Sequence, residues 1–96
     1  MLQSANKKKL RALGQQLPVL VQIGMDGLTP NIYENLNAQL EAHELVKVGL
    51  LKSAEVDVRQ AAIECAAETG SEIVHMIGHT FLLYRQSKEN RLGIRQ

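Results

Sequence analysis

The sequence has few residues of the kinds that carry several common functions. Of its 96 residues none is tryptophan, and the only aromatic residues are Tyr33, Phe81 and Tyr84. Because single-stranded nucleic acid is commonly held by stacking its bases on such rings, recognition of that kind is disfavoured. Cys65 is the only cysteine, so the chain has neither a disulfide framework nor a thiolate metal cage, and an intracellular, cytoplasmic location is expected.

Membrane-spanning and catalytic patterns are also missing. No apolar stretch approaches the roughly 18 residues that a membrane helix requires, and residues 1–9 carry charge with no apolar segment behind them, unlike a secretory signal. His75 and His79 are four residues apart, but no acidic residue completes an H-E-x-x-H pattern. Cys65 lies on a small apolar helix face, where a cysteine behaves as an inert hydrophobic residue. We therefore predict a non-enzymatic protein with no cofactor, no metal and no small-molecule substrate.

The composition is that of one globular domain, with 45% hydrophobic and 22% charged residues. The formal net charge is only +1, which by itself argues against a nucleic-acid partner. The basic residues nevertheless gather at the two ends of the chain, whereas the acidic residues lie almost entirely between Asp26 and Glu72. If the fold brings the two ends together, one face is basic, and this local field is what a phosphate backbone experiences. The basic residues at the ends are Lys7, Lys8, Lys9, Arg11, Arg85, Lys88, Arg91 and Arg95.

Hydrophobic periodicity and capping residues predict the element order α-β-α-β-α-β-β. Such alternation favours an α/β domain with three helices and a four-stranded mixed sheet. The almost uninterrupted apolar run Val19–Ile23 is typical of a strand covered on both faces. The predicted elements are a helix capped by Ser4 or Asn6 and ending near Gln16, the strand Val19–Ile23, a helix from Pro30 to about Ala42, the strand Leu45–Leu51, a helix capped by Ser53 or Asp57 and ending near Thr69, and a hairpin of Ile73–Ile77 with Thr80–Arg85.

Residues 86–96 are polar and basic and show no period. We interpret residues 1–86 as the domain and residues 87–96 as a C-terminal tail. The sequence leaves open whether that tail is ordered without a partner.

The most informative stretch is Gly24-Met25-Asp26-Gly27, which joins the first strand to a helix capped by Thr29. Glycine can adopt positive φ and lets another backbone approach closely, and the N-terminus of a helix attracts phosphate. In KH-type domains a G-x-x-G loop clamps the nucleic-acid backbone in this way. Two glycines three apart are also common in ordinary turns, so both interpretations stay open on local grounds.

Three separate stretches stand out, namely Val21–Thr29, Glu44–Val48, and Ile77–Thr80 with Leu83–Arg85. Together they resemble the CRM domain, the chloroplast RNA-splicing and ribosome-maturation or YhbY-like family. The resemblance covers roughly residues 2–86, at a length similar to the single-domain prokaryotic members. It implies a fold akin to the C-terminal domain of bacterial translation initiation factor three, and RNA binding through the G-x-x-G loop and an adjacent basic surface.

Carried over by position, the resemblance implies an RNA-binding set on the loop, the first helix and the last strand. The family commonly has lysine after the first glycine, where this chain has Met25, followed by Asp26. Asp26 either repels phosphate at the loop tip or stabilises the turn by bonding its own backbone. The implied residues are Gly24, Met25, Asp26, Gly27, Thr29, Lys7, Lys8, Lys9, Arg11 and Arg85.

The resemblance also implies a setting and a partner. For single-domain members we expect docking on ribosomal RNA during assembly of the large ribosomal subunit, by a monomer that does not bind membranes. The alternative is a protein-interaction module that joins ribosomal particles through proteins, with the acidic middle segment as its contact face. That acidic face includes Glu34, Glu41, Glu44, Glu64, Glu68 and Glu72.

Overall fold

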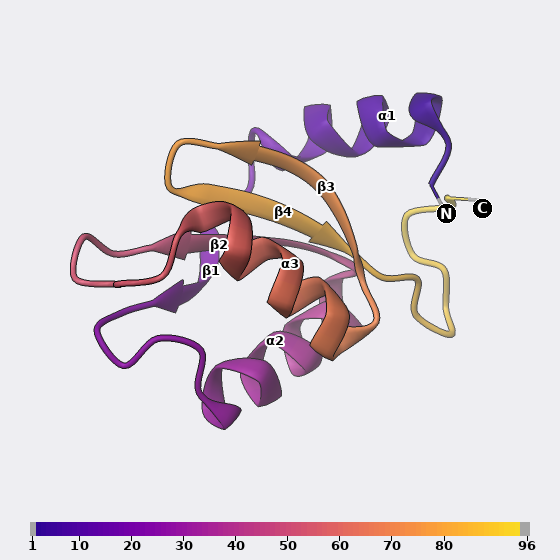
Figure 1. Ribbon diagram of the computed structural model, residues 1–96. Coiled ribbons are helices and arrows are strands. Elements are labelled where there is room, and N and C mark those ends of the chain that lie inside the picture. The colour runs from indigo at the N-terminus through magenta and orange to yellow at the C-terminus, as the bar shows by residue number, and fades with distance from the viewer. Residues whose placement is uncertain (1, 95–96) are drawn as a thin grey trace.

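A computed structural model describes residues 2–94, which form three helices and one four-stranded sheet (Figure 1). The predicted α/β architecture and element order are confirmed. None of the helices within these residues is long and apolar enough to cross a bilayer. The elements are α1 (Ser4–Gly14), β1 (Val19–Ile23), α2 (Pro30–His43), β2 (Leu45–Leu50), α3 (Val58–Thr69), β3 (Glu72–Ile77) and β4 (Thr80–Tyr84).

Two of the three helices begin at the side chains that the sequence indicates. The Thr29 hydroxyl oxygen accepts a hydrogen bond from the Ile32 N–H at 3.2 Å, which caps α2. The Asp57 carboxylate accepts the first free N–H groups of α3 in the same way. Gly70 ends α3 at φ +63°, the left-handed conformation that glycine adopts at least cost.

The first helix begins differently from the prediction. Its N-cap is Gln3, and within residues 2–94 no side chain caps it, so the expected cap by Ser4 or Asn6 is wrong. The chain is instead anchored one residue earlier, where the Leu2 N–H donates to the Glu72 carboxylate at 2.7 Å. This anchor fixes where the helix starts without the help of a capping side chain.

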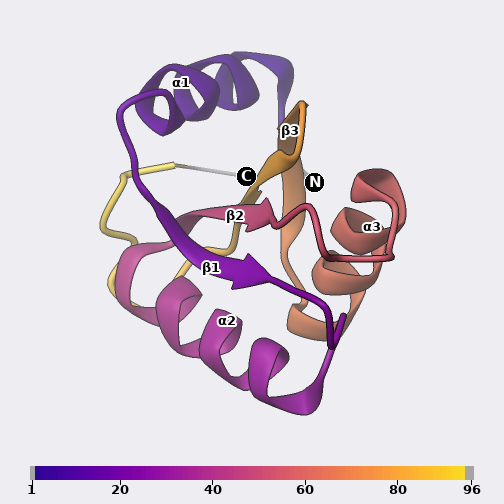
Figure 2. The same ribbon diagram turned by 90° about the vertical axis from the view of Figure 1, so that its left-hand side faces the viewer.

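The sheet has the strand order β1-β2-β4-β3, with β1 parallel to β2 and the remaining neighbours antiparallel. Helices α2 and α3 cover one face, and α1 lies on the other (Figure 2). The larger core cluster therefore lies under α2 and α3. It consists of Val21, Ile23, Leu36, Leu40, Val46, Val48, Ala61, Ala62, Cys65, Phe81 and Leu83. The smaller cluster, on the α1 side, consists of Leu2, Leu10, Leu45, Val74, Leu82, Tyr84 and Ile94.

Strand β1 is covered on one face only, so the prediction of two covered faces is wrong. Val21 and Ile23 are buried in the larger core, whereas Leu20 is 38% exposed and Gln22 is also exposed. The physical reason is that β1 is an edge strand, with β2 as its single neighbour, and the cover over the α1 face does not extend across it. A continuous apolar run therefore does not distinguish an enclosed strand from an edge strand.

Helix α1 approaches the sheet through Leu10 and Gly14, one helical turn apart and both buried. A Cβ atom at position 14 would lie 2.3 Å from a methyl carbon of Leu82, so the close approach depends on the missing side chain. Leu13, by contrast, is 41% exposed because it is turned toward the edge strand.

The C-terminal segment is packed against the domain as far as residue 94. The carboxylate of Glu44 is fully buried and accepts hydrogen bonds from Ser87, through its N–H at 2.8 Å and its hydroxyl, and from the Leu92 N–H at 2.9 Å. Ile94 is buried in the same cluster as Leu2, so the two ends of the described chain meet. The segment thus needs no partner to be ordered to that point, and Arg95 lies outside the described residues.

Candidate RNA interface

The G-x-x-G stretch forms a closed turn at the end of β1. The Gly27 N–H donates to the Gly24 carbonyl oxygen at 3.0 Å, and Met25 projects from the turn with 75% of its surface exposed. Gly27 has φ +71°, and a Cβ atom there would meet nothing within 4 Å. The turn therefore requires glycine at position 27 and leaves open space in front of it, as close approach by another backbone would need.

The first turn of α2 has fewer free donors than a typical helix N-terminus. Pro30 has no N–H, and the Ile32 N–H is bonded to Thr29. Within residues 2–94 no hydrogen bond engages the Asp26 carboxylate, so that carboxylate does not stabilise the turn by bonding its own backbone. It stays exposed at the tip. Any anion that approaches the turn meets this negative charge, and cations from elsewhere must outweigh it.

The predicted cations of the first helix lie on the opposite face of the sheet from α2, into which the turn leads (Figure 2). Lys8, Lys9 and Arg11 are exposed on α1. Lys7 is half-buried and lines a shallow hollow together with Glu72. The positively charged helix α1 and the glycine-containing turn are thus two separate regions and do not form one continuous patch.

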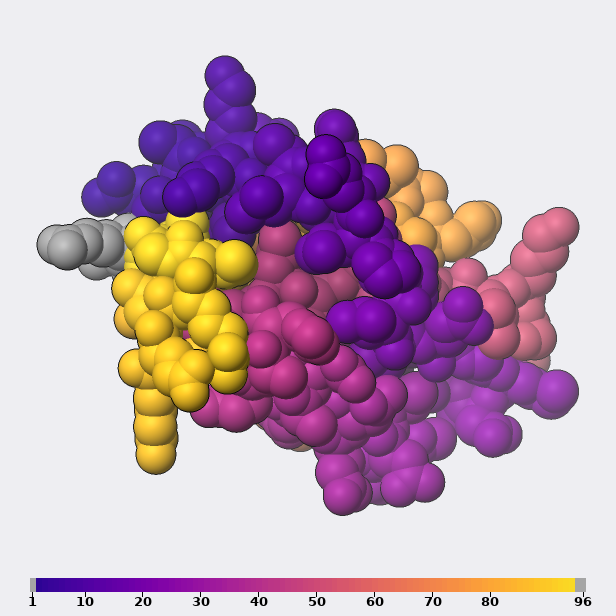
Figure 3. All heavy atoms as spheres, turned by 180° about the vertical axis from the view of Figure 1, so that it is seen from behind, coloured from indigo at the N-terminus to yellow at the C-terminus, as the bar shows by residue number. Residues whose placement is uncertain are grey.

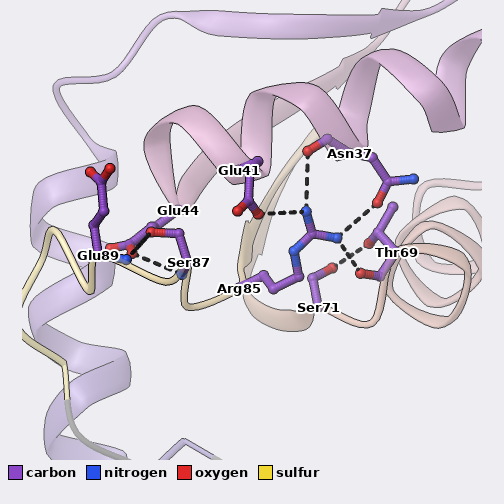
Figure 4. A network of polar contacts seen from close by, with 8 residues as sticks. All are labelled: Asn37, Glu41, Glu44, Thr69, Ser71, Arg85, Ser87 and Glu89. Atoms are coloured by element: carbon purple, nitrogen blue, oxygen red, sulfur yellow. Dashed lines mark hydrogen bonds and ion pairs between the residues drawn. The ribbon is translucent and has the colours of Figure 1, made fainter.

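Arg85, which the sequence places in the same set, is engaged inside the fold. One of its guanidinium nitrogens donates to the Asn37 side-chain oxygen at 2.8 Å and to the Thr69 carbonyl at 2.7 Å. The other donates to the Asn37 carbonyl at 3.1 Å and lies 3.5 Å from a Glu41 carboxylate oxygen (Figure 4). Arg85 therefore ties α2 to the C-terminal end of α3, and the structure favours a structural role for it.

Two further segments lie beside the turn. The Leu51 N–H donates to the Ile23 carbonyl at 2.9 Å, and the Leu50 N–H donates to the His79 carbonyl at 2.8 Å. The turn, the loop 51–57 and the β3–β4 turn consequently meet at one end of the sheet. Figures 1 and 3 show the first two side by side at that end from opposite sides.

This grouping brings an exposed lysine, Lys52, to the end of the sheet that carries the turn. The residues that the sequence predicts for the interface do not include it. A usable signal was present, because β1 and β2 are parallel neighbours and the carboxyl ends of such strands meet at the same edge.

Two of the three aromatic rings and the single thiol are buried. Phe81 and Tyr84 are buried, and Tyr33 is half-buried against the larger core. Cys65 is also buried, and burial raises the pKa of its thiol to about 11. Within residues 2–94 no group of three or more His, Cys, Asp or Glu side chains could hold a metal ion. What the surface offers a ligand is therefore backbone at the turn and the exposed cations.

The fold and the turn define a class of protein, a small α/β domain in which a G-x-x-G turn leads from an edge strand into a capped helix. Residues 2–85 match the family model of the CRS1/YhbY (CRM) domain. The chain belongs to this family.

Relatives over the whole length carry similar names. The chain is 35% identical to the "Probable RNA-binding protein YqeI" of Bacillus subtilis, over 95% of each chain. It is 33% identical to a protein of Haemophilus influenzae named "RNA-binding protein", over 97% of this chain and 94% of the relative. The solution structure of SAV1595 from Staphylococcus aureus superposes with a TM-score of 0.82 at 35% identity, covering 99% of this chain and 98% of that one.

Proposed function

We propose that this protein is a non-enzymatic RNA-binding protein that docks on ribosomal RNA during assembly of the large ribosomal subunit. The observation that carries the proposal is the turn at Gly24–Gly27, with its open space at Gly27, in a chain whose full-length relatives are named RNA-binding proteins. The ribosomal setting comes from the family resemblance, and it would place the protein in the cytoplasm.

The proposed interface has two parts. The turn, with Met25, Asp26 and Thr29, faces the RNA backbone, and the α1 cations attract phosphates by long-range electrostatics. Because the rings of Phe81 and Tyr84 are buried, recognition proceeds through backbone and RNA shape rather than base stacking. Arg85 is left out because its guanidinium is occupied within the fold. The α1 cations are Lys7, Lys8, Lys9 and Arg11.

Sedimentation of a lysate through sucrose gradients at low and high salt tests the ribosomal setting. Co-migration with the large subunit or its precursors at low salt, lost at high salt, supports electrostatic docking. A protein that stays at the top of the gradient under both conditions contradicts it. Capture of ribosomal proteins that survives ribonuclease treatment would favour the protein-interaction alternative.

A matched pair of glycine variants tests the turn directly with purified protein and protein-stripped ribosomal RNA. Gly27 and Gly70 both have positive φ and open space around Cβ, but Gly70 lies at the far end of α3. Asparagine tolerates this conformation better than other side chains and adds no charge. We expect Gly27→Asn to weaken RNA binding and Gly70→Asn to leave it unchanged, at equal cost in stability. If Gly27→Asn and Gly70→Asn bind the RNA with equal affinity, the turn is not part of the interface.

A further inference from the structure

A hollow of about 230 Å³ lies on the α1 face of the sheet, beside the C-terminal end of α1. Its lining includes three basic side chains from three different elements, Arg11 of α1, Lys47 of β2 and His75 of β3. Among residues 2–94 no acidic side chain lines it. The remaining lining residues are Gly14, Gln15, Ile77, Thr80, Phe81 and Leu82.

The three basic side chains converge because of the register of the sheet. Leu82 of β4 has two cross-strand partners, Lys47 on the neighbouring strand β2 and His75 on the neighbouring strand β3. Gly14 of α1 packs on that leucine so closely that a Cβ atom would lie 2.3 Å from its methyl carbon. Arg11 is one helical turn before Gly14 and is therefore held over the same point.

These side chains are not used by the fold. Within residues 2–94 no hydrogen bond or ion pair engages the side chains of Arg11, Lys47 or His75, in contrast to Arg85 on the other face. Lys47 and His75 are half-buried, so their positions are set by the strands that carry them. Lys47 and Arg11, two cations that line the same hollow without a partner within residues 2–94, create a local positive potential that attracts an anion.

The size of the hollow limits what that anion can be. Pockets for drug-sized molecules typically measure about 300–1,000 Å³, and this hollow is smaller. It suits one anionic group of a larger ligand, such as a phosphate with its ester oxygens. A lysine supplies a point charge and an arginine a planar fork of donors, both of which suit phosphate oxygens.

The hollow reaches the end of the sheet that carries the G-x-x-G turn. Ile77 and Thr80 line it, and the two residues between them form the β3–β4 turn. The His79 carbonyl in that turn is bonded to Leu50, and the next residue, Leu51, is bonded to β1 just before Gly24. A strand of RNA that follows this end of the sheet can reach both sites.

We propose that the hollow binds a backbone phosphate of the same RNA that the turn contacts, with Lys47 and Arg11 as its cationic partners and His75 as an N–H donor. This inference rests on the proposed function and adds Lys47 and His75 to it. It also links the turn at the end of the sheet to the α1 cations on one of its faces.

Charge-removing variants test the site against protein-stripped ribosomal RNA. Lys47→Gln is expected to weaken binding by about tenfold at low salt and to reduce the slope of log affinity against log salt by about 0.7–0.9, the loss of one phosphate contact. His75→Gln weakens binding less. The matched controls are Lys88→Gln on the exposed C-terminal segment and His43→Gln at the end of α2, and both keep the wild-type slope.

A conservative variant separates a direct contact from a folding effect, because Lys47 is half-buried. Lys47→Arg keeps the charge and should keep the salt slope, whereas urea unfolding reports whether Lys47→Gln is folded. If Lys47→Gln is unfolded, the loss of affinity expected for His75→Gln, compared with His43→Gln, decides. Loss of affinity with an unchanged slope would overturn the phosphate contact.

The outcomes distinguish this inference from the proposed function. Wild-type protein that does not bind the RNA overturns both. RNA binding that falls in Gly27→Asn but not in Lys47→Gln or His75→Gln overturns the hollow and leaves the proposed function standing. If those two variants instead lose only binding of an acidic peptide, the hollow serves a protein partner and the inference is wrong.

Discussion

The two faces of the sheet differ in how completely they are covered. Helices α2 and α3 together enclose the larger core on one face. On the other face α1 and the C-terminal segment enclose a smaller core and stop short of the strand ends, where the hollow and the exposed part of β1 lie. The open part of this second face carries Lys47 and His75, half-buried basic side chains that make no hydrogen bond or ion pair within residues 2–94.

This difference in cover explains why one basic side chain has partners within the fold and another has none. Arg85 faces the enclosed side, where Asn37, Glu41 and the Thr69 carbonyl surround its guanidinium. Lys47 faces the open side, where no partner within residues 2–94 engages its amine. Both are single basic residues in strand-like segments of the sequence. Which of them is free to bind a ligand depends on the helix that covers each face.

The largest expected effect concerns the stability of the two cores. Leu36→Ala should lower the free energy of unfolding by about 3–5 kcal/mol, which is near the upper end of the range for Leu→Ala in a core. The cost is high because α2 and α3 hold the surroundings of Leu36 in place, so the void cannot close. Leu10→Ala should cost about 2–3 kcal/mol, since α1 alone can shift to fill part of the void. Urea unfolding measures both. Equal or reversed costs would show that the two faces contribute alike.

The second prediction concerns the anchor of the C-terminal segment. Burial raises the pKa of Glu44, but the hydrogen bonds from Ser87 and from the Leu92 N–H outweigh it and hold that pKa below its ordinary value. Glu44→Gln replaces one acceptor oxygen by an amide that meets N–H donors, at an expected cost of about 1–3 kcal/mol.

The lowered pKa also fixes a pH dependence. The carboxylate stabilises the fold above the pKa that Glu44 has in the unfolded chain, and this contribution is lost as pH falls through the lower pKa of the folded state. Wild-type protein should therefore lose stability below about pH 4.5, and Glu44→Gln should lose less over the same range. Parallel acid curves for the two proteins would contradict this role.

The third prediction tests the cations of the open side. With about four phosphate contacts, the slope of log affinity against log salt for the wild type should be near −3. The double variant Lys8→Glu with Lys9→Glu should weaken RNA binding by roughly 10- to 100-fold and flatten that slope without unfolding the protein. The same double reversal at Lys88 and Arg91, on the C-terminal segment, is the control. A wild-type affinity independent of salt would contradict electrostatic docking.

The features that the sequence predicts are those decided by neighbours in the chain. Thr29 before Pro30 and Asp57 before α3 each act within one helical turn, and both caps are confirmed. The hydrophobic alternation of β2 also places Lys47 on the face opposite Val46 and Val48. These signals are local, so one sequence is enough to read them.

The features that the sequence does not predict depend on residues far apart in the chain. Arg85 meets Asn37 48 residues away, and Glu44 meets Ser87 43 residues away. A buried glutamate cannot be recognised from its surroundings in the sequence, so the sequence predicts an acidic surface that includes Glu44, whereas the structure buries it. The hollow likewise depends on where α1 ends over Leu82. Such properties follow from packing and become visible only in the structure.

The smallest expected effect concerns the tip of the turn, where this chain lacks the lysine common in the family. Met25 is 75% exposed and no structural role depends on it, so Met25→Lys should leave stability within about 0.5 kcal/mol of the wild type. A solvated lysine adds one phosphate contact, and we expect RNA affinity to rise by about three- to fivefold and the salt slope to steepen by about 0.7–0.9.

Two further variants show whether charge is the cause of that gain. Asp26→Asn removes the repulsive carboxylate without adding a cation, so its gain should be smaller. Met25→Gln changes the polarity of the tip without charge and should bind as the wild type does. Filter binding over a range of salt concentrations compares all three. If Met25→Lys and Asp26→Asn both bind like the wild type, the tip lies away from the RNA phosphates, and the open face with Lys47 would then carry the electrostatic part of binding.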